Sequence, residues 1–137
     1  MAETFVFELV SPERLLMSEQ VEQVDVPGSE GDFGVLAHHA PFISTLRPGL
    51  MRIRTGSQTR EIFVRGGLAE VRANSLTVLA EQAIPVEEID EGKLAEEIRN
   101  AEEDVADARD EAARHRAEVH LAQLREVVSA LKAAGHA

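Results

Sequence analysis

The chain has 137 residues, of which 44% are hydrophobic and 28% charged, a composition that fits one compact globular domain with an appendage. Its 25 acidic and 14 basic side chains give a net charge of -11, which repels phosphate backbones and anionic lipid heads and disfavours nucleic-acid binding. The absence of cysteine excludes disulfide bonds, thiolate metal sites and a cysteine nucleophile.

Apolar stretches are short throughout the chain. Residues 76–80, among the longest, fall far short of the roughly 20 residues that a membrane-spanning helix needs, so no direct membrane insertion is predicted. The first seven residues lack the basic region and apolar stretch of a secretory signal, and they lack the Arg-rich pattern of an organelle presequence. We therefore expect an intracellular protein.

The composition changes near residue 86. All proline and phenylalanine residues, and all glycines except Gly92 and Gly135, lie in residues 1–86. Residues 87–137 are rich in alanine and contain no proline or aromatic ring, which is helix-forming composition. The sequence predicts an α+β protein in two parts: an N-terminal antiparallel β-sandwich over residues 1–86, followed by a C-terminal α-helical hairpin over residues 87–137.

Short alternating segments predict the strands of the first part. Phe5, Phe7 and Leu9 recur at every second position, which places them on one face of a strand. Further strands are predicted at residues 15–17, 21–26, 50–55, 61–65, 68–72 and 76–80, with turn signals between them that include Pro27-Gly28, Pro48-Gly49 and Gly66-Gly67. Such short strands at regular spacing indicate an antiparallel sandwich or barrel. Around residues 52–54 and 62–64, charged and apolar residues alternate, so these strands are expected to keep one face in water.

Two apolar stripes predict the helices of the second part. Asp90 fits an N-cap, and apolar residues follow it at spacings of four and three from Leu94 to Ala112. A second stripe runs from Ala117 to Leu131, but the step from Ala112 to Ala117 is five residues, so the stripes do not share one straight face. We expect a bend or hairpin near residues 114–116, with a single long helix carrying a rotated stripe as the alternative.

Charge is unevenly distributed over these helices. Residues 87–111 hold twelve acidic and three basic side chains, and Glu103, Asp107 and Glu111 would form a like-charge column at four-residue spacing. Residues 112–137 reverse the balance. Two oppositely charged helices are therefore able to fold back on each other.

Catalytic and metal-binding patterns are absent from the sequence. The glycine-rich residues 27–34 lack the Gly-Lys-Ser/Thr ending of a phosphate loop, and they are interpreted as a surface turn suited to partner contact. His38 and His39 would point opposite ways in an extended backbone, and His115 and His120 are five residues apart, so no metal site is predicted. No serine lies in an elbow motif and no carboxylate pair suits acid–base work, so neither catalysis nor a cofactor is expected.

Three blocks of the first part carry a family resemblance. They read VPGSEGDFG at residues 26–34, HAP and LRPGLMRI at residues 39–41 and 46–53, and GGLAEV and LTVLA at residues 66–71 and 76–80. In this order and spacing the blocks cover residues 4–86, and the chain resembles the epsilon-subunit family of bacterial rotary (F-type) ATP synthases, equivalent to the mitochondrial delta subunit. Residues 87–137 resemble the family only as two helices.

The resemblance implies a non-catalytic rotor subunit of a proton-translocating ATP synthase. Its sandwich would hold the gamma subunit on one side and the membrane-embedded c ring below, at the cytoplasmic face of the bacterial inner membrane. The family pattern places the polar loops of the c ring against Ser29, Glu30, Gly31 and Asp32, with His39 nearby. A loop bearing carboxylates suits basic or amide-rich ring loops.

The resemblance also bears on regulation. In this family the helices fold against the sandwich or extend toward the beta subunits, where they inhibit hydrolysis, and some members bind ATP through Ile/Leu-Asp-x-x-Arg-Ala. Here Ile89 and Asp90 are followed by Lys93 and Leu94 in place of Arg-Ala. This degenerate motif predicts at most weak regulation. Two alternatives are a nucleotide-binding regulatory module whose helices close over ATP, and an unrelated sandwich enzyme, for which no catalytic residue set is present.

Overall fold

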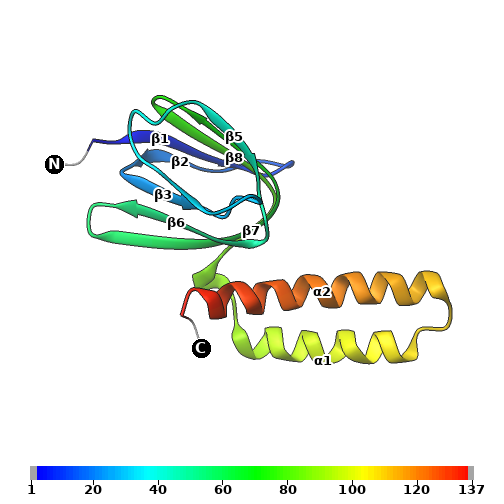
Figure 1. The fold of residues 1–137 in the computed structure, drawn as a ribbon. Coiled ribbons are helices and arrows are strands. Elements are labelled where there is room, and N and C mark those ends of the chain that lie inside the picture. The colour runs from blue at the N-terminus through cyan, green and yellow to red at the C-terminus, as the bar shows by residue number, and fades with distance from the viewer. Residues whose placement is uncertain (1–2, 136–137) are drawn as a thin grey trace. The chain divides into compact units, whose positions relative to one another are not determined.

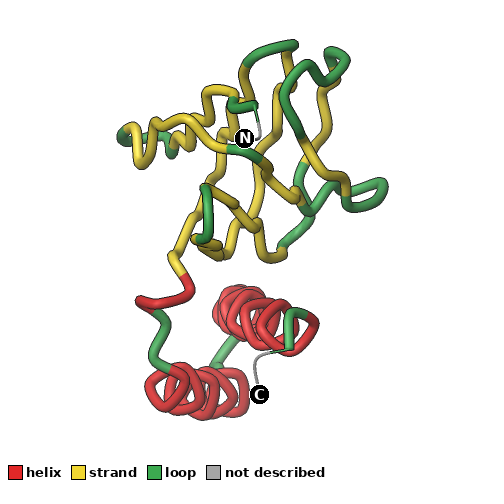
Figure 2. The backbone as a smooth tube through the Cα atoms, turned by 90° about the vertical axis from the view of Figure 1, so that its left-hand side faces the viewer, coloured by secondary structure: helices red, strands yellow, loops and turns green. Residues whose placement is uncertain are grey.

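The computed structural model describes residues 3–135 and divides the chain into two compact units, residues 1–86 and residues 87–137. The first unit is a β-sandwich and the second is a pair of helices (Figures 1 and 2). The fold class predicted from the sequence is confirmed. Within the described residues, no helix is both long and apolar enough to cross a membrane.

Eight strands form the sandwich. They are β1 (Phe5–Val10), β2 (Leu15–Val21), β3 (Gln23–Val26), β4 (Phe33–Val35), β5 (Phe42–Thr45), β6 (Gly49–Thr55), β7 (Gln58–Arg72) and β8 (Ser75–Pro85), and a 3-10 turn (Val86–Glu88) follows. Hydrogen bonding joins them in the order β2-β1-β8-β7-β6-β3-β4, and β5 pairs with β7. The pairing is antiparallel except between β1 and β8, which run parallel. The sheet is therefore mixed and not wholly antiparallel. Strands β2 to β7 together form the long connection that this parallel pair requires.

Strand β7 joins two segments that the sequence pattern separates. Its first part pairs with β6, from Gln58 to Val64, and its later part pairs with β5, from Leu68 to Val71. Gly66 (φ 70°) and Gly67 (φ 101°) lie where the partner changes. Figure 1 shows β7 curving there from one layer of the sandwich into the other. The Gly-Gly pair is therefore a bend within one strand, because left-handed backbone bends the strand without ending the ladder to β8.

The core lies between the layers. Phe5, Phe7 and Leu9 are buried as predicted, together with residues that include Val24, Val26, Val35, Met51, Ile53, Val64, Val71, Leu76 and Val78. On β6, Arg52 and Arg54 are exposed on either side of buried Ile53, so the expected wet face is present on that strand. The expectation is wrong for residues 62–64, which are all buried. On the outward side, the guanidinium of Arg65 lies over the Phe63 ring, 5.1 Å from its centroid.

The second unit is a helical hairpin of α1 (Glu91–Asp107) and α2 (Glu111–Ala133). Asp90 caps α1 as predicted, since its Oδ1 accepts a hydrogen bond from the Lys93 amide at 3.0 Å. The break between the helices lies at residues 108–110 and not at 114–116, because Asp110 caps α2 by accepting from the Ala113 amide at 2.7 Å. The alternative of one long helix is thereby excluded.

The apolar seam of the hairpin explains the misplaced turn. Ala113, and not Ala112, is the half-buried residue at the start of α2, and it precedes Ala117 by the regular four positions. The buried residues of the two helices are Leu94, Ala101, Leu121, Val127, Ala130 and Leu131. Arg125 Nη2 reaches Glu102 Oε2 on the other helix at 3.0 Å. The expected like-charge column is interrupted, because Asp107 ends α1 and Glu111 begins α2.

Candidate partner-binding surfaces

The loop between β3 and β4, residues 27–32, is a tight turn built around glycine. The Gly31 amide donates to the Gly28 carbonyl oxygen at 3.2 Å, and Gly31 has φ of 141°. Gly28 is buried, and a Cβ there would lie 3.0 Å from the Phe33 ring. The turn therefore needs glycine at both positions.

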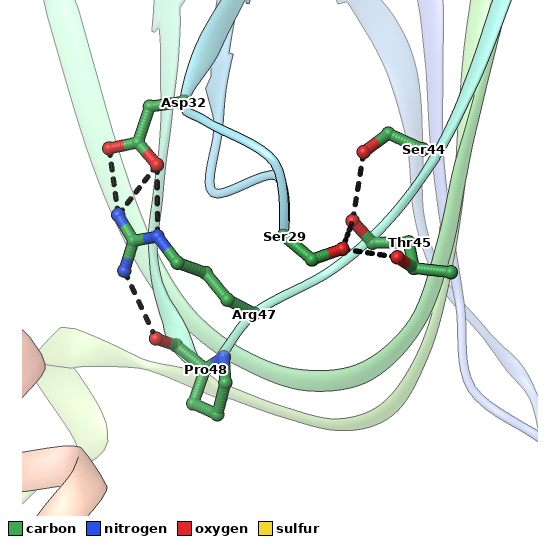
Figure 3. Close-up of polar contacts among 6 residues, drawn as sticks. All are labelled: Ser29, Asp32, Ser44, Thr45, Arg47 and Pro48. Carbon is green, nitrogen blue, oxygen red and sulfur yellow. Dashed lines mark hydrogen bonds and ion pairs between the residues drawn. The ribbon is translucent and has the colours of Figure 1, made fainter.

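The start of this loop is hydrogen-bonded to the segment that joins β5 to β6. The amide and the hydroxyl of Ser29 each donate to the Thr45 carbonyl oxygen at 2.9 Å. The Ser29 hydroxyl is also hydrogen-bonded to the Thr45 hydroxyl (Figure 3). The Arg47 amide donates to the Pro27 carbonyl oxygen at 3.0 Å. The loop is thus fixed to residues 45–47 by main-chain bonds.

The two carboxylates of the loop have different surroundings. Asp32 accepts from Arg47 through both carboxylate oxygens, with Nη2 at 2.6 and 2.7 Å and Nε at 3.0 Å (Figure 3). Glu30 is exposed, and no side chain among residues 3–135 forms an ion pair with it. The structure therefore places Ser29, Glu30, Gly31 and Asp32 together, with Glu30 as the open carboxylate.

His39 does not join this group by any hydrogen bond. The His39 Nδ1 lies 2.8 Å from the Ala40 carbonyl oxygen. His39 comes before β5 in the chain, whereas the loop is bonded to Thr45, the last residue of β5. The neighbouring His38 (φ 65°) has its Nε2 at 2.9 Å from a Glu3 carboxylate oxygen. Across residues 3–135, no group of three or more His, Cys, Asp or Glu side chains could hold a metal ion.

A line of apolar side chains crosses the outer face of the sheet, and sequence analysis missed it. Strand register aligns Leu68 on β7, Leu79 on β8, Val10 on β1 and Leu15 on β2. The chain neighbours Ala69, Val78 and Leu9 are buried, so Leu68, Leu79 and Val10 point away from the core, and Leu15 is exposed beside the partly buried Leu16. Leu79 is 45% and Leu15 55% exposed. We call these four residues the outer apolar row.

The outer apolar row and the loop are adjacent. Thr45, which anchors Ser29, pairs with Leu68 at one end of the row. Ile43, two residues before Thr45 on the same strand, is 63% exposed. Alternation in each strand already places these residues outward, but only the register shows that they form one line.

The residues of the degenerate nucleotide motif lie at the start of the hairpin. The Asp90 carboxylate is used as the helix cap, Ile89 is half-buried and Lys93 is exposed. A groove of about 420 Å³ lies between the beginning of α1 and the end of α2, and none of these three residues lines it. Its lining is Glu91, Leu94, Ala95, Ile98, Arg99, Val128, Leu131 and Lys132.

Comparison with known proteins decides the family. The family model described as "ATP synthase, Delta/Epsilon chain, beta-sandwich domain" matches residues 4–86. The chain belongs to the ATP synthase delta/epsilon chain family. The resemblance seen in the three sequence blocks is confirmed.

Family members resemble the chain over nearly its whole length. The ATP synthase epsilon chain of Mesorhizobium japonicum is 51% identical over 125 residues, which cover 90% of this chain and 93% of the relative. That of Parvibaculum lavamentivorans is 51% identical over 128 residues, covering 93% and 97%. Among solved structures, a chain of the Euglena gracilis mitochondrial ATP synthase OSCP/F1/c-ring complex has a TM-score of 0.77 at 27% identity, covering 96% of this chain and 83% of that one. A chain of the Tetrahymena thermophila central stalk and c ring shares the fold, with a TM-score of 0.57 at 14% identity, and covers 95% of this chain and 98% of that one.

Proposed function

We propose that this delta/epsilon family member is a non-catalytic subunit of the central stalk in a proton-translocating F-type ATP synthase, where it links the gamma subunit to the c ring. It acts peripherally at the cytoplasmic face of the bacterial inner membrane. The observation that carries the proposal is the outer apolar row running up to the anchored loop at Thr45. Two surfaces of different chemistry on one rigid sandwich suit a subunit that joins two partners.

The outer apolar row is the proposed gamma-binding surface. Covering the exposed parts of Leu79 and Leu15 would contribute about 1 kcal/mol each, roughly half of the value for a fully buried leucine. Ile43, two residues from Thr45 along β5, adds exposed apolar surface beside the row. An apolar centre with a polar margin is the usual composition of a stable protein interface.

The loop from Ser29 to Asp32 is the proposed c-ring contact. Its open carboxylate, Glu30, is suited to basic or amide side chains on the polar loops of the ring. His39, three residues before the start of β5, would contribute separately and not as part of the hydrogen-bonded loop. Because the loop is fixed by hydrogen bonds before binding, it is able to transmit torque without first becoming ordered.

Recovery of the complex from solubilised membranes tests the gamma contact. The tagged chain is expected to bring down gamma and c subunits, and Leu79→Glu is expected to reduce that yield at least about tenfold, because a carboxylate would be buried against apolar surface. Arg54→Glu is the control, because Arg54 is also an exposed strand residue and lies on β6, outside the outer apolar row. Equal recovery with both variants would show that gamma binds elsewhere.

Cysteine crosslinking tests the c-ring contact. The chain contains no cysteine, so a Glu30→Cys variant supplies the sole thiol. It is expected to crosslink to cysteines placed in the polar loops of the c ring. Crosslinking confined to alpha or beta subunits would reverse the proposed orientation.

The groove of the hairpin favours a second candidate, a regulatory module that binds ATP, with contact to beta subunits when the helices extend. Arg99 and Lys132 supply positive charge beside apolar walls. Against it, the motif residues do not line the groove, and residues 87–111 carry twelve acids and three bases. We therefore propose at most weak regulation of hydrolysis. Isothermal titration of the full chain with ATP separates the two candidates, since micromolar affinity would favour the regulatory module.

A further inference from the structure

The ion pair between Asp32 and Arg47 closes the loop of residues 27–32. Arg47 uses Nε and Nη2 on the carboxylate, and its third nitrogen, Nη1, donates to the Pro48 carbonyl oxygen at 3.2 Å (Figure 3). A planar guanidinium bound to three acceptor oxygens is held in one orientation. The carboxylate of Asp32 is held with it.

Arg47 contacts both ends of the loop. Its main-chain amide donates to Pro27 at the beginning, and its side chain pairs with Asp32 at the end. Between these points, Ser29 is bonded to Thr45, and Glu30 stands exposed. Arg47, one residue of the β5–β6 connection, therefore holds both the beginning and the end of the loop.

We propose that Arg47 is a positioning residue for the loop: it keeps Asp32 as an internal counter-ion, so that Glu30 is the carboxylate presented to a partner. This inference rests on the proposed contact of the loop with the c ring. The partner group that it fits is a lysine, an arginine or an amide donor.

Hydrogen exchange in the isolated full chain tests the positioning role without any partner. Arg47→Gln is expected to speed exchange of the Ser29 amide on the order of two- to fivefold, the range expected when one exposed ion pair is lost. Arg54→Gln is the matched control, because Arg54 is an exposed arginine that pairs with no side chain among residues 3–135. Equal Ser29 exchange in the two variants overturns the inference.

Crosslinking in the assembled complex tests the consequence for binding. With Glu30→Cys as the reporter, Arg47→Gln is expected to lower the yield of crosslink to the c ring several-fold, and Arg54→Gln is expected to leave it unchanged. Asp32→Asn, alone or combined with Arg47→Gln, should lower the yield as much as Arg47→Gln alone, because the two residues act as one unit. Additive losses would mean that each residue touches the ring independently, which overturns the positioning role.

The two proposals fail in different ways. If Glu30→Cys forms no crosslink to the ring when Arg47 is intact, the proposed c-ring contact is wrong. If it forms a crosslink that does not respond to Arg47→Gln, the contact stands and the positioning role alone is wrong. Equal unfolding temperatures of the Arg47 and Arg54 variants would show that a lowered yield does not come from lost stability.

Discussion

Replacing Gly67 by alanine should destabilise the sandwich much more than replacing Gly56, a hairpin glycine, by alanine. Gly67 has φ of 101° at the bend of β7, and a Cβ added there would overlap the Leu79 carbonyl oxygen. Left-handed backbone costs a residue with a Cβ about 1–2 kcal/mol. Overlap with backbone cannot be relieved by rotating a side chain, and it adds roughly 1–3 kcal/mol, as overpacking does.

The sum, about 2–5 kcal/mol, is a large part of the stability of a small domain. It corresponds to a fall in unfolding temperature of roughly 8 to 40 °C for a domain of this size. The effect should reach the loop of residues 27–32 as well, because the Gly67 carbonyl oxygen accepts from the Leu46 amide at 3.1 Å. Leu46 lies between Thr45 and Arg47, the two residues that hold the loop.

Scanning calorimetry is the suitable assay, since the chain has neither tryptophan nor tyrosine as a fluorescent probe. Gly56→Ala is the matched control. Gly56 also has positive φ, 61°, but no atom outside its chain neighbours lies within 4 Å of an added Cβ. Gly56→Ala therefore carries only the cost of the left-handed backbone. If Gly67→Ala unfolds at the same temperature as Gly56→Ala, the close approach of β7 to Leu79 does not constrain the bend and the reasoning fails.

Three further predictions follow from the separate structure of the two units. A chain truncated after Val86 should unfold cooperatively in calorimetry, because the whole sandwich core lies within residues 5–83, and a non-cooperative transition would show that the helices complete it. Asp110→Ala should cost the hairpin about 1 kcal/mol through loss of the α2 cap, seen as a lower helix melting temperature by circular dichroism, with Glu118→Ala as an exposed control that should change little. Deleting residues 87–137 should change ATP hydrolysis by the intact complex only slightly, and a several-fold rise would instead establish an inhibitory role for the helices.

Several parts of the fold follow from local sequence alone. The alternation of Phe5, Phe7 and Leu9 fixes a strand and its inward face, because neighbouring side chains of a strand point to opposite sides. The change of composition near residue 86 separates strand-forming from helix-forming sequence. Asp90 caps α1 where its spacing from the apolar stripe predicts. Each of these features depends on residues within a few positions of one another.

Other features required the pairing of distant segments. The sequence gives no preference for which strand lies next to which, so the outer apolar row appears only when the register brings Leu68, Leu79, Val10 and Leu15 into line. The Gly66-Gly67 pair looks like a turn in the sequence, and it is a bend because β8 continues to pair on one side while the partner on the other side changes from β6 to β5. The position of the hairpin turn also depends on tertiary packing: Ala112 and Ala113 are equally apolar in the sequence, but only Ala113 is half-buried in the structure.

The same distinction applies to the candidate site: part of it follows from the local sequence, and part follows only from the tertiary structure. The sequence by itself determined that a glycine-rich, carboxylate-bearing surface turn begins at residue 27, but Phe33 and Gly34, which the sequence assigned to the same turn, belong to strand β4. Only the tertiary structure decided that Asp32 pairs with Arg47, fifteen residues away, and that Glu30 remains open. The reason is physical: backbone conformation is governed by neighbouring residues, whereas the partner of a charged side chain is set by how the rest of the chain folds around it.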